Sequence, residues 1–370
     1  MDEVVNMFNN RFKGKKVLIT GNTGFKGSWL SLWLINLGAK VYGISKDIPS
    51  IPSLFQELNL DSTSEHYYED IRKFEKVRSL IDQIGPDYIF HMAAQPIVGE
   101  SYKDPLETLS SNIMGTANVL ESLRTVDKKC VCIIITSDKC YENVEQVWGY
   151  KEDDNLGGND IYSCSKASAE IVVNSYFKSF FENSEKIRIC SVRAGNVIGG
   201  GDWAKYRVVP DCMRAWKEKQ SVTIRNPNST RPWQHVLEPL SGYLHLADLL
   251  TDNEELNGES FNFGPISINN KTVKELLVGL SSYWELENDA FILEKNSQQF
   301  HEAGLLQLNC DKALHYLDWT PNLLFEDLIE FTSKWYYKYY KNGKDTLEFT
   351  SNQINEFQDK ARKKNFVWTK

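Results

Sequence analysis

The sequence predicts an α/β fold, with a doubly wound parallel sheet followed by a smaller C-terminal lobe. The first half alternates short β-branched runs with helical patterns, and a glycine-rich loop follows the first run. After Gly195 the pattern becomes irregular, with three consecutive glycines at 199–201 and four prolines between 210 and 239. We therefore expect a nucleotide-binding domain at 1–195 and a substrate lobe at 196–370, with segments at about 234–264 returning to the large domain.

The expected elements follow from the period of the apolar residues. Apolar, β-branched runs predict strands at 16–20, 40–44, 66–70, 88–91, 131–136 and 187–193. Longer patterns predict helices at 28–37, 74–84, 106–123, 162–180, 273–283 and 324–340. The charged tail from Lys341 onward predicts a surface helix. Strands that alternate with helices require crossover connections, and hence a parallel sheet.

Composition excludes several classes of function. The net charge of −8 argues against a general nucleic-acid binder, which needs a basic surface. No apolar run is long enough to cross a membrane, and residues 1–13 lack the apolar stretch of a signal peptide. The seven cysteines are scattered, and none has metal-ligand spacing with histidine, so no metal site is expected. These features predict a cytoplasmic protein with reduced cysteines.

The glycine loop G-N-T-G-F-K-G lies between the first strand and the first helix. Gly21, Gly24 and Gly27 would let the chain turn sharply and let backbone amides approach a pyrophosphate at the helix N-terminus. An ordinary glycine-rich turn is the alternative, but the strand–loop–helix context favours a Rossmann-type dinucleotide site. Thr23, Phe25 and Lys26 lie in the same loop and are counted as cofactor-binding.

The residues leave the choice between NAD and NADP open. An NAD enzyme usually places an acidic residue after the second strand, where it binds the ribose 2′-hydroxyl. Here the strand ends in Gly43-Ile44-Ser45-Lys46. A lysine at that point would also tolerate a 2′-phosphate.

Tyr162 and Lys166 are four residues apart, which places both on one face of a helix. A tyrosine hydroxyl has a pKa of about 10, and a neighbouring ammonium favours its phenolate. The pair can then remove a proton from a sugar hydroxyl. The same spacing also occurs on the surfaces of ordinary amphipathic helices. Its position after the glycine loop and the fifth strand favours catalysis.

The fifth strand ends in Thr136-Ser137-Asp138-Lys139-Cys140-Tyr141. Active groups of open α/β sheets lie at the carboxyl ends of strands. Ser137 would hydrogen-bond the reacting hydroxyl, and Asp138 and Lys139 would supply an acid and a base. The alternative is a polar turn after a buried strand.

At these residues the sequence resembles the extended short-chain dehydrogenase/reductase superfamily, in its nucleotide-sugar branch. The 4,6-dehydratases of this branch carry an acid–base pair after the Ser/Thr, and Asp-Lys is typical of those that act on CDP-glucose. The resemblance spans about 13–319. It includes G-F-K-G-S-W-L-S-L-W-L (24–34), P-S-L-F (52–55), A-A-Q-P-I-V (93–98), T-S-D-K-C-Y-E-N (136–143), R-A-G-N-V-I-G-G-G-D-W (193–203) and R-P-W-Q-H-V-L-E-P-L-S-G-Y-L (231–244).

The resemblance implies a lyase that oxidises C4 of CDP-glucose, eliminates water across C5 and C6, and returns the hydride to C6. Tyr162, with Lys166 and Ser137, would take the C4 hydroxyl proton. Lys139 would take the C5 proton, and Asp138 would protonate the leaving C6 hydroxyl. Lys139 acts as a base only if its pKa falls below the usual value near 10.4.

Further site residues follow from the resemblance and from the charge of the substrate, because arginine forks suit pyrophosphate. The additional cofactor-binding candidates are Asp70, Ile71, Ala93 and Gln95. The substrate-binding candidates are Asn196, Arg207, Arg214, Arg225, Arg231, His301 and Glu302, although any one of these arginines can instead be an ordinary surface residue.

Two departures from the family pattern and two competing readings remain. Gly99-Glu100 replaces an expected basic residue, and Ile161 replaces the proline usual before Tyr162. A nucleotide-sugar 4-epimerase or simple oxidoreductase would keep Tyr162 and Lys166 without needing the Asp-Lys pair. A non-catalytic dinucleotide sensor would often lose either Tyr162 or Lys166.

In this superfamily the helices at 106–123 and 162–180 pair across a two-fold axis, which implies a homodimer or a homotetramer.

Overall fold

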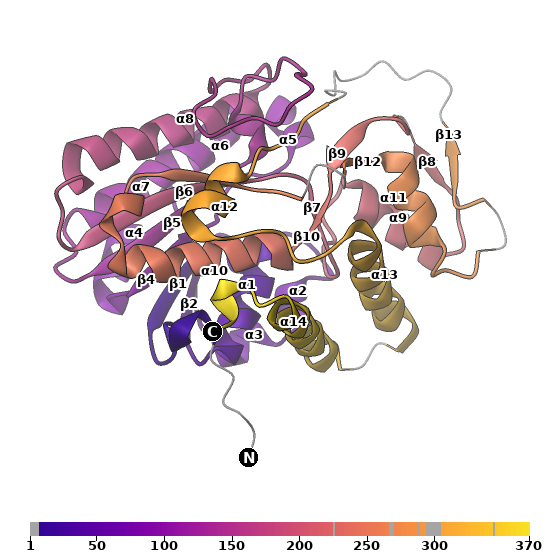
Figure 1. The fold of residues 1–370 in the computed structure, drawn as a ribbon, viewed down its shortest axis with the longest axis horizontal. Helices are drawn as coiled ribbons and strands as arrows, with labels where there is room; N and C mark the ends of the chain where they lie inside the picture. Colours follow the sequence, from indigo (N-terminus) through magenta and orange to yellow (C-terminus); the bar gives the residue numbers. More distant parts are fainter. Residues whose placement is uncertain (1–6, 225, 266–269, 287–288, 294–304, 343–344) are drawn as a thin grey trace.

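A seven-stranded parallel sheet forms the centre of the computed structural model, which describes residues 7–224, 226–265, 270–286, 289–293, 305–342 and 345–370 (Figure 1). Its strand order is β11-β6-β5-β4-β1-β2-β3. The chain therefore reverses direction across the sheet between β1 and β4, where ligands bind in folds of this kind. The strands are β1 (Lys16–Thr20), β2 (Lys40–Ser45), β3 (Glu65–Tyr68), β4 (Tyr88–His91), β5 (Cys130–Ile135), β6 (Ile187–Ala194) and β11 (Ser260–Phe263).

Alternate residues of the strands face two separate cores, because side chains of a strand alternate between the faces of a sheet. Val17 and Ile19 of β1 face one core, and Leu18 faces the other. The first core also contains residues of α1 (Phe25–Asn36) and α10 (Leu237–Asp252). The second contains residues of α4 (Phe74–Ile84) and α7 (Gly115–Leu123), together with Val173 of α8 (Ile161–Tyr176). This confirms the expected doubly wound α/β fold.

The six expected strands are all present, with ends shifted by at most two residues. The two long helices are interrupted near their middle or end by π-helical turns. The first runs as α6 (Pro105–Leu109), η2 (Ser110–Met114) and α7, and the second continues from α8 into η4 (Phe177–Phe181). The sequence pattern did not indicate these wider turns.

Part of the second half returns to the sheet. β11 pairs with β6, and α10 contacts β5, β6 and β11. The expected division into two domains at 195/196 stays a prediction. The remaining strands form three two-stranded sheets, β7 (Val197–Ile198) with β10 (Gln234–His235), β8 (Val222–Ile224) with β13 (Phe291–Leu293), and β9 (Thr230–Pro232) with β12 (Asn270–Thr272).

The lobe on the right of Figure 1 holds β8, β9, β12 and β13 beside three helices. These helices are α9 (Val208–Lys217), α11 (Val273–Ser281) and α13 (Phe325–Asn342). Shorter elements connect the main ones: η1 (Phe8–Asn10), α2 (Leu54–Glu57), α3 (Leu60–Thr63), α5 (Val98–Lys103), η3 (Asp138–Cys140), η5 (Glu254–Leu256), α12 (Asp311–Leu317) and η7 (Val367–Thr369).

The charged tail is not simply a surface helix. It forms α14 (Thr346–Lys363), whose Ile354 and Phe357 are fully buried and belong to the same core as α1. Phe8 near the N-terminus stacks on Trp368 with 5.4 Å between the ring centroids, and the amide of Asn9 donates to the carbonyl of Lys370 at 2.9 Å. The apolar positions of the tail, rather than its charges, determine where it lies.

All seven cysteines lie among the described residues. All seven cysteines have free thiols, and Cys130 and Cys132 lie in the same core, as expected from their spacing in β5. Among the described residues, no group of His, Cys, Asp and Glu has the arrangement of a metal site. No helix in the described part of the chain is both long and apolar enough to cross a membrane.

Candidate active site

The glycine loop leaves no room for side chains at two of its three glycines. Gly21 has φ +78°, and a Cβ there would lie 2.8 Å from the backbone nitrogen of Ala93. A Cβ on Gly27 would lie 2.2 Å from the carbonyl oxygen of Gly21. The loop therefore packs backbone against backbone at the start of α1. The amides of the first helical turn have no partner within the helix, which suits an anion.

Replacement of Gly27 by alanine should weaken dinucleotide binding. The added methyl group must push the loop away from α1, and such overpacking typically costs about 1–3 kcal/mol, or roughly 5- to 150-fold in affinity. The test is a fluorescence titration with NAD. Gly99→Ala is the matched control, because a Cβ at Gly99 meets no atom within 4 Å. Equal affinity of Gly27→Ala and Gly99→Ala would show that the loop does not bind the cofactor.

Residues at the end of β2 hold the glycine loop. The Ser45 hydroxyl donates to Asn22 Oδ1 at 2.8 Å, and the Thr23 hydroxyl donates to the carbonyl of Asp47 at 2.7 Å. The Asn22 side chain lies over Gly43, where a Cβ would come within 2.0 Å of its amide nitrogen. Gly43 is therefore required for the loop to lie against β2.

Asp70, one of the predicted cofactor-binding residues, belongs to a network of charged side chains. Asp70 and Glu107 both pair with Arg72, and Lys46 pairs with Glu107 at 3.1 Å. The Arg72 guanidinium holds the pKa of Asp70 below its usual value. Ile71 is buried against Gly115, where a Cβ would lie 2.4 Å from the Ile71 side chain.

Hydrogen bonds connect the loop after β4 to β1 and, through Asn112, to α8. The amide of Ala93 donates to the Thr20 hydroxyl at 3.1 Å. The buried side chain of Asn112, in the π-helical turn η2, accepts from the amide of Gln95 at 2.8 Å and donates to the Ser165 hydroxyl at 2.8 Å. Asn112 thus links the Gln95 loop to the residue that precedes Lys166. Sequence analysis missed it, although a polar residue in an apolar helix is a signal.

Tyr162 and Lys166 lie buried in the first two turns of α8. Asp160 caps this helix by accepting from the amide of Ser163 at 2.9 Å. Burial raises the pKa of Tyr162 to about 12, against the lowering effect of a hydrogen bond with Ser137 and of Arg207. Burial lowers the pKa of Lys166 to about 8. The Tyr162 hydroxyl therefore has a hydrogen bond with Ser137, and Lys166 follows one turn later on the same face of α8.

The acid–base pair after β5 forms the short helix η3. The Ser137 hydroxyl donates to Asp138 Oδ1 at 3.0 Å and accepts from the amide of Lys139 at 3.2 Å. Asp138 is buried, and its Oδ2 has no hydrogen-bond partner among the described residues. Burial raises the pKa of Asp138, while Lys139 beside it acts in the opposite direction. A raised pKa suits a group that donates a proton.

Three further cations surround these groups. Burial, together with the charges of Lys166 and Arg207, lowers the pKa of Lys26 to about 7. The Lys26 ammonium lies 3.4 Å from the Tyr243 hydroxyl. Arg231 acts on Asp138 and lowers its pKa. Arg207 and Arg231 therefore lie beside the reacting groups.

The other predicted substrate residues are placed differently. Arg214 on α9 donates to the carbonyl of Trp203 at 3.0 Å and pairs with Asp211 of its own helix. It is not among the charges that act on Tyr162 or Asp138. The carbonyl of Asn196 accepts from the amide of Gln234 at 3.0 Å, which joins β7 to β10. Arg225, His301 and Glu302 lie outside the described residues.

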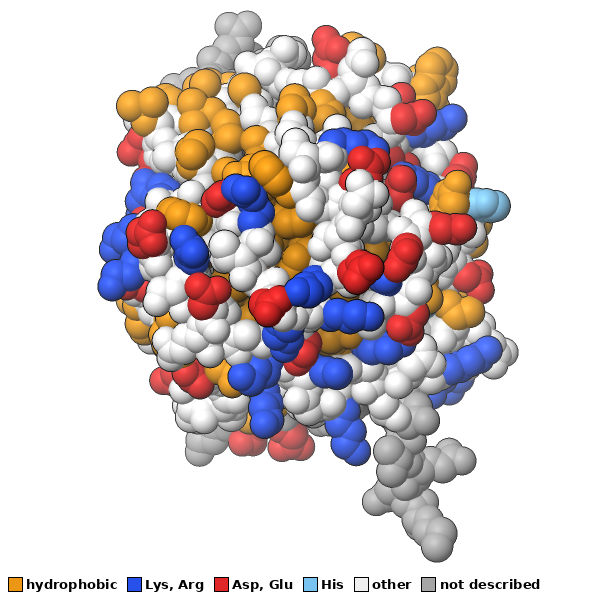
Figure 2. All heavy atoms as spheres, turned by 90° about the vertical axis from the view of Figure 1, so that its left-hand side faces the viewer, with side chains coloured by type: hydrophobic (Ala, Val, Ile, Leu, Met, Phe, Trp, Pro, Cys, Tyr) orange, Lys and Arg blue, Asp and Glu red, His pale blue; other side chains and the backbone are white. Residues whose placement is uncertain are grey.

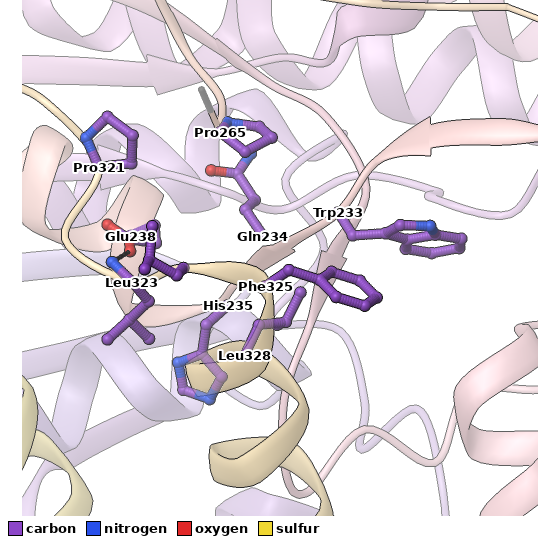
Figure 3. Close-up of a pocket in the computed structure, with 10 residues that line it drawn as sticks. Trp233, Gln234, His235, Glu238, Pro265, Pro321, Leu323, Phe325 and Leu328 are labelled. Atoms are coloured by element: carbon purple, nitrogen blue, oxygen red, sulfur yellow. Dashed lines mark hydrogen bonds between the residues drawn. The ribbon is translucent and has the colours of Figure 1, made fainter. Parts of the chain in front are cut away.

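A small pocket near β10 lies apart from the predicted catalytic residues. It is lined by residues of β10, of α10 and of the segment that leads into α13, among them Gln234, His235, Glu238, Leu323 and Phe325 (Figure 3). Glu238 accepts from the amide of Asn322 at 2.8 Å. Burial raises the pKa of Glu238 to about 7. Since its carboxylate binds backbone amides, we interpret this pocket as part of the packing of α10 against the C-terminal segment.

The residues of this site can perform three chemical functions. Tyr162 and Lys166 can move a proton at a hydroxyl, Asp138 and Lys139 can work as acid and base on an adjacent carbon, and the glycine loop can bind a pyrophosphate. All of them lie at the carboxyl ends of β1 and β5 or on α8. These are the parts of a nicotinamide-dependent enzyme of the short-chain dehydrogenase type.

The chain belongs to the GDP-mannose 4,6-dehydratase family, whose model matches residues 18–332. It is 46% identical over 352 residues to the CDP-glucose 4,6-dehydratase of Salmonella typhimurium, covering 94% of this chain and 97% of that protein. It is 26% identical over 291 residues to the dTDP-D-glucose 4,6-dehydratase of Dictyostelium discoideum, which covers 72% of this chain and 62% of that protein.

Solved structures agree with the fold. An epimerase from Methanothermobacter thermautotrophicus superposes with a TM-score of 0.78 at 24% identity, covering 90% of this chain and 95% of that one. The dTDP-glucose 4,6-dehydratase of Bacillus anthracis, solved with NAD, superposes with a TM-score of 0.71 at 19% identity, covering 88% and 97%.

Proposed function

We propose that this chain is a CDP-glucose 4,6-dehydratase, which forms CDP-4-dehydro-6-deoxy-D-glucose. The observation that carries the proposal is the Asp138-Lys139 pair, which lies at the end of β5 beside Ser137 and Tyr162. A nucleotide-sugar 4-epimerase needs only Tyr162 and Lys166, so it leaves the acid–base pair without a use. The 46% identity to a CDP-glucose 4,6-dehydratase supports the same activity.

The side chains divide between two half-reactions. Tyr162, favoured as a phenolate by the Lys166 ammonium and assisted by Ser137, takes the proton from the C4 hydroxyl. The resulting ketone acidifies the C5 proton, which Lys139 removes. Asp138, whose pKa is raised by burial, gives its proton to the departing C6 hydroxyl. A nicotinamide held at the glycine loop would supply the acceptor for the C4 hydride and its donor to C6, while Lys139 returns the proton to C5.

The cofactor we propose is NAD. The glycine loop and the start of α1 would hold its pyrophosphate, and Asp70 and Ile71 would flank its adenine. Lys46 is paired with Glu107, and the nearby carboxylate makes its ammonium less attractive to a 2′-phosphate. Gln95 and Ala93 would complete the site from the loop after β4. Because nucleotide sugars and NAD are cytoplasmic metabolites, we expect the enzyme to act in the cytoplasm.

The substrate is tested by incubating the enzyme with CDP-, dTDP-, GDP- and UDP-glucose. We expect a 4-keto sugar, detected by its ultraviolet band in alkali, from CDP-glucose and without net consumption of NAD. Build-up of NADH in proportion to substrate would instead identify a dehydrogenase. Interconversion of two sugars without a keto product would identify an epimerase.

We also propose that the protein forms a homodimer, or a dimer of dimers, through α6, η2, α7 and α8. Apolar side chains are exposed along these helices at Leu106, Met114, Ile171 and Phe180, with Ile171 56% exposed. Figure 2 looks toward the side where α4, α7 and α8 end, and it shows hydrophobic side chains gathered at its upper left and along its centre. Exposed apolar patches of this kind favour a protein interface.

Met114→Glu combined with Ile171→Glu should convert the dimer to a monomer. Burial of two unpaired charges at the centre of an interface costs several kcal/mol, which corresponds to more than about 100-fold in dimer affinity. Light scattering at micromolar concentration measures the mass. Leu314→Glu is the control, because Leu314 is exposed on α12. A monomeric wild-type protein would contradict the prediction.

A further inference from the structure

A buried ion pair lies directly behind the candidate catalytic residues. The carboxylate of Glu170 on α8 and the guanidinium of Arg193 on β6 are 3.0 Å apart, and their side chains are only 3% and 4% exposed. The second nitrogen of Arg193 donates to the Tyr141 hydroxyl at 2.7 Å and to the carbonyl of Glu152 at 2.9 Å. The two charges are therefore paired within the protein interior, where an unpaired charge would be very costly, although Arg193 Nε has no hydrogen-bond partner among the described residues.

Glu170 also holds the end of the strand that carries the acid–base pair. Its Oε1 accepts a hydrogen bond from the Thr136 hydroxyl, and its Oε2 accepts one from the Ser191 hydroxyl at 2.7 Å. Thr136 immediately precedes Ser137, Asp138 and Lys139. The position of that segment relative to α8 therefore depends on the carboxylate of Glu170.

Glu170 lies one helical turn after Lys166, on the same face of α8. Burial lowers the pKa of Lys166 to about 8, and the Glu170 carboxylate raises it, so that burial alone would lower it further. The Cys140 thiol also acts on Lys166, but burial raises its pKa well above the ordinary value and it is neutral near pH 7. Among the described groups that act on Lys166, Glu170 is therefore the one that is negative at neutral pH.

The remaining charges near this part of α8 do not replace Glu170. Arg193 is positive, Lys26 with its pKa of about 7 is positive or neutral, and His91 is neutral, because burial lowers its pKa to about 3. The carboxylates of the helices packed against α8 are already paired with their own cations. These pairs are Glu100 with Lys103, Glu107 with Arg72 and Lys46, and Glu121 with Arg124. Asp138 and Arg207 lie on the side of Tyr162 and act on its hydroxyl.

We propose that Glu170 is a positioning residue of the reaction, which keeps Lys166 protonated beside Tyr162 and fixes the strand end that carries Ser137, Asp138 and Lys139. This rests on the proposed function, since it assigns Glu170 a part in forming the Tyr162 phenolate. A carboxylate that only stabilised the fold would have no effect on the pH dependence of that step.

Glu170→Gln tests the proposal, because it removes the charge and keeps nearly the same volume. Without the carboxylate, Lys166 loses its proton at lower pH, and its cation no longer favours the Tyr162 phenolate at neutral pH. We expect the rising limb of the pH–rate profile to move up by about one pH unit. The rate should therefore fall about tenfold more at pH 7 than at pH 9, while the affinity for NAD changes less than about threefold.

Two further variants separate this effect from a loss of structure. Glu121→Gln breaks a comparable pair on the exposed face of α7 and should leave the pH profile unchanged. Glu170→Gln with Arg193→Met leaves no unpaired buried charge, and should shift the limb in the same direction even if the single variant fails to fold. A rate that falls by the same factor at every pH would overturn the proposal. Failure of the wild type to convert CDP-glucose would instead overturn the proposed function.

Discussion

Tyr162→Phe should abolish oxidation at C4 while leaving the fold intact. The substitution removes the hydroxyl whose pKa Ser137 and Arg207 lower, against the raising effect of burial. Removal of a general base typically lowers the rate by about 10²–10⁴-fold. On mixing enzyme, NAD and CDP-glucose, we expect neither the absorbance of reduced nicotinamide nor a 4-keto product. Stopped-flow absorbance and product analysis measure both.

Tyr316→Phe is the matched control for this experiment. Tyr316 is exposed on α12, so loss of its hydroxyl should leave the rate unchanged. If Tyr162→Phe formed product within a few-fold of the wild-type rate, another group would have to take the C4 proton. The proposal for α8 would then be wrong, although the dinucleotide site would not be affected.

Lys139→Ala should separate oxidation from elimination. Tyr162 and Lys166 remain, so C4 is still oxidised, but the C5 proton stays in place because its base is missing. Reduced nicotinamide should then accumulate in a single turnover, and formation of 6-deoxy product should fall by about 10²–10⁴-fold. Absorbance of the reduced cofactor and the product yield are followed in the same sample.

Lys139→Arg and Asp138→Asn complete this comparison. Arginine keeps the positive charge of Lys139 but does not deprotonate, so it should behave like alanine. Asp138→Asn removes the acid that protonates the C6 hydroxyl and should also stop the reaction after oxidation. Adjacent acid and base groups can share one proton, so the two variants report on the pair together. Near-normal product from Lys139→Ala would remove lysine from the mechanism.

The sequence predicted the sheet well because its signals are local. Most of the first six strands are short apolar runs between turn residues, with the polar β3 (Glu65–Tyr68) as an exception, and the glycine spacing requires a tight loop before α1. The packing of the C-terminal tail was predicted wrongly. Its many charges suggested a surface helix, whereas Ile354 and Phe357 are spaced to face the core once α1 is in place.

The catalytic candidates were accessible from the sequence because they fall in short motifs. Glu170, Arg193 and Asn112 were missed, since each acquires its partners only when distant segments meet. Glu170 binds residues of β5 and β6, and Asn112 joins the loop after β4 to α8. A charged or amide side chain within an apolar helix was the one signal available. The charges of Arg207 and Arg231 act on Tyr162 and Asp138, and Arg207 also pairs with Asp202 at 3.0 Å, while their expected role at the pyrophosphate stays a prediction.

The central claim is that one active site oxidises C4, eliminates water and reduces C6 of the same sugar. The most direct measurement uses CDP-glucose labelled with deuterium at C4 and follows the label by NMR and mass spectrometry. We predict that deuterium appears at C6 of the CDP-4-keto-6-deoxy product, with no net change in NAD. Deuterium that is recovered in released NADH, or that remains at C4 of a sugar that has not lost water, would contradict the account.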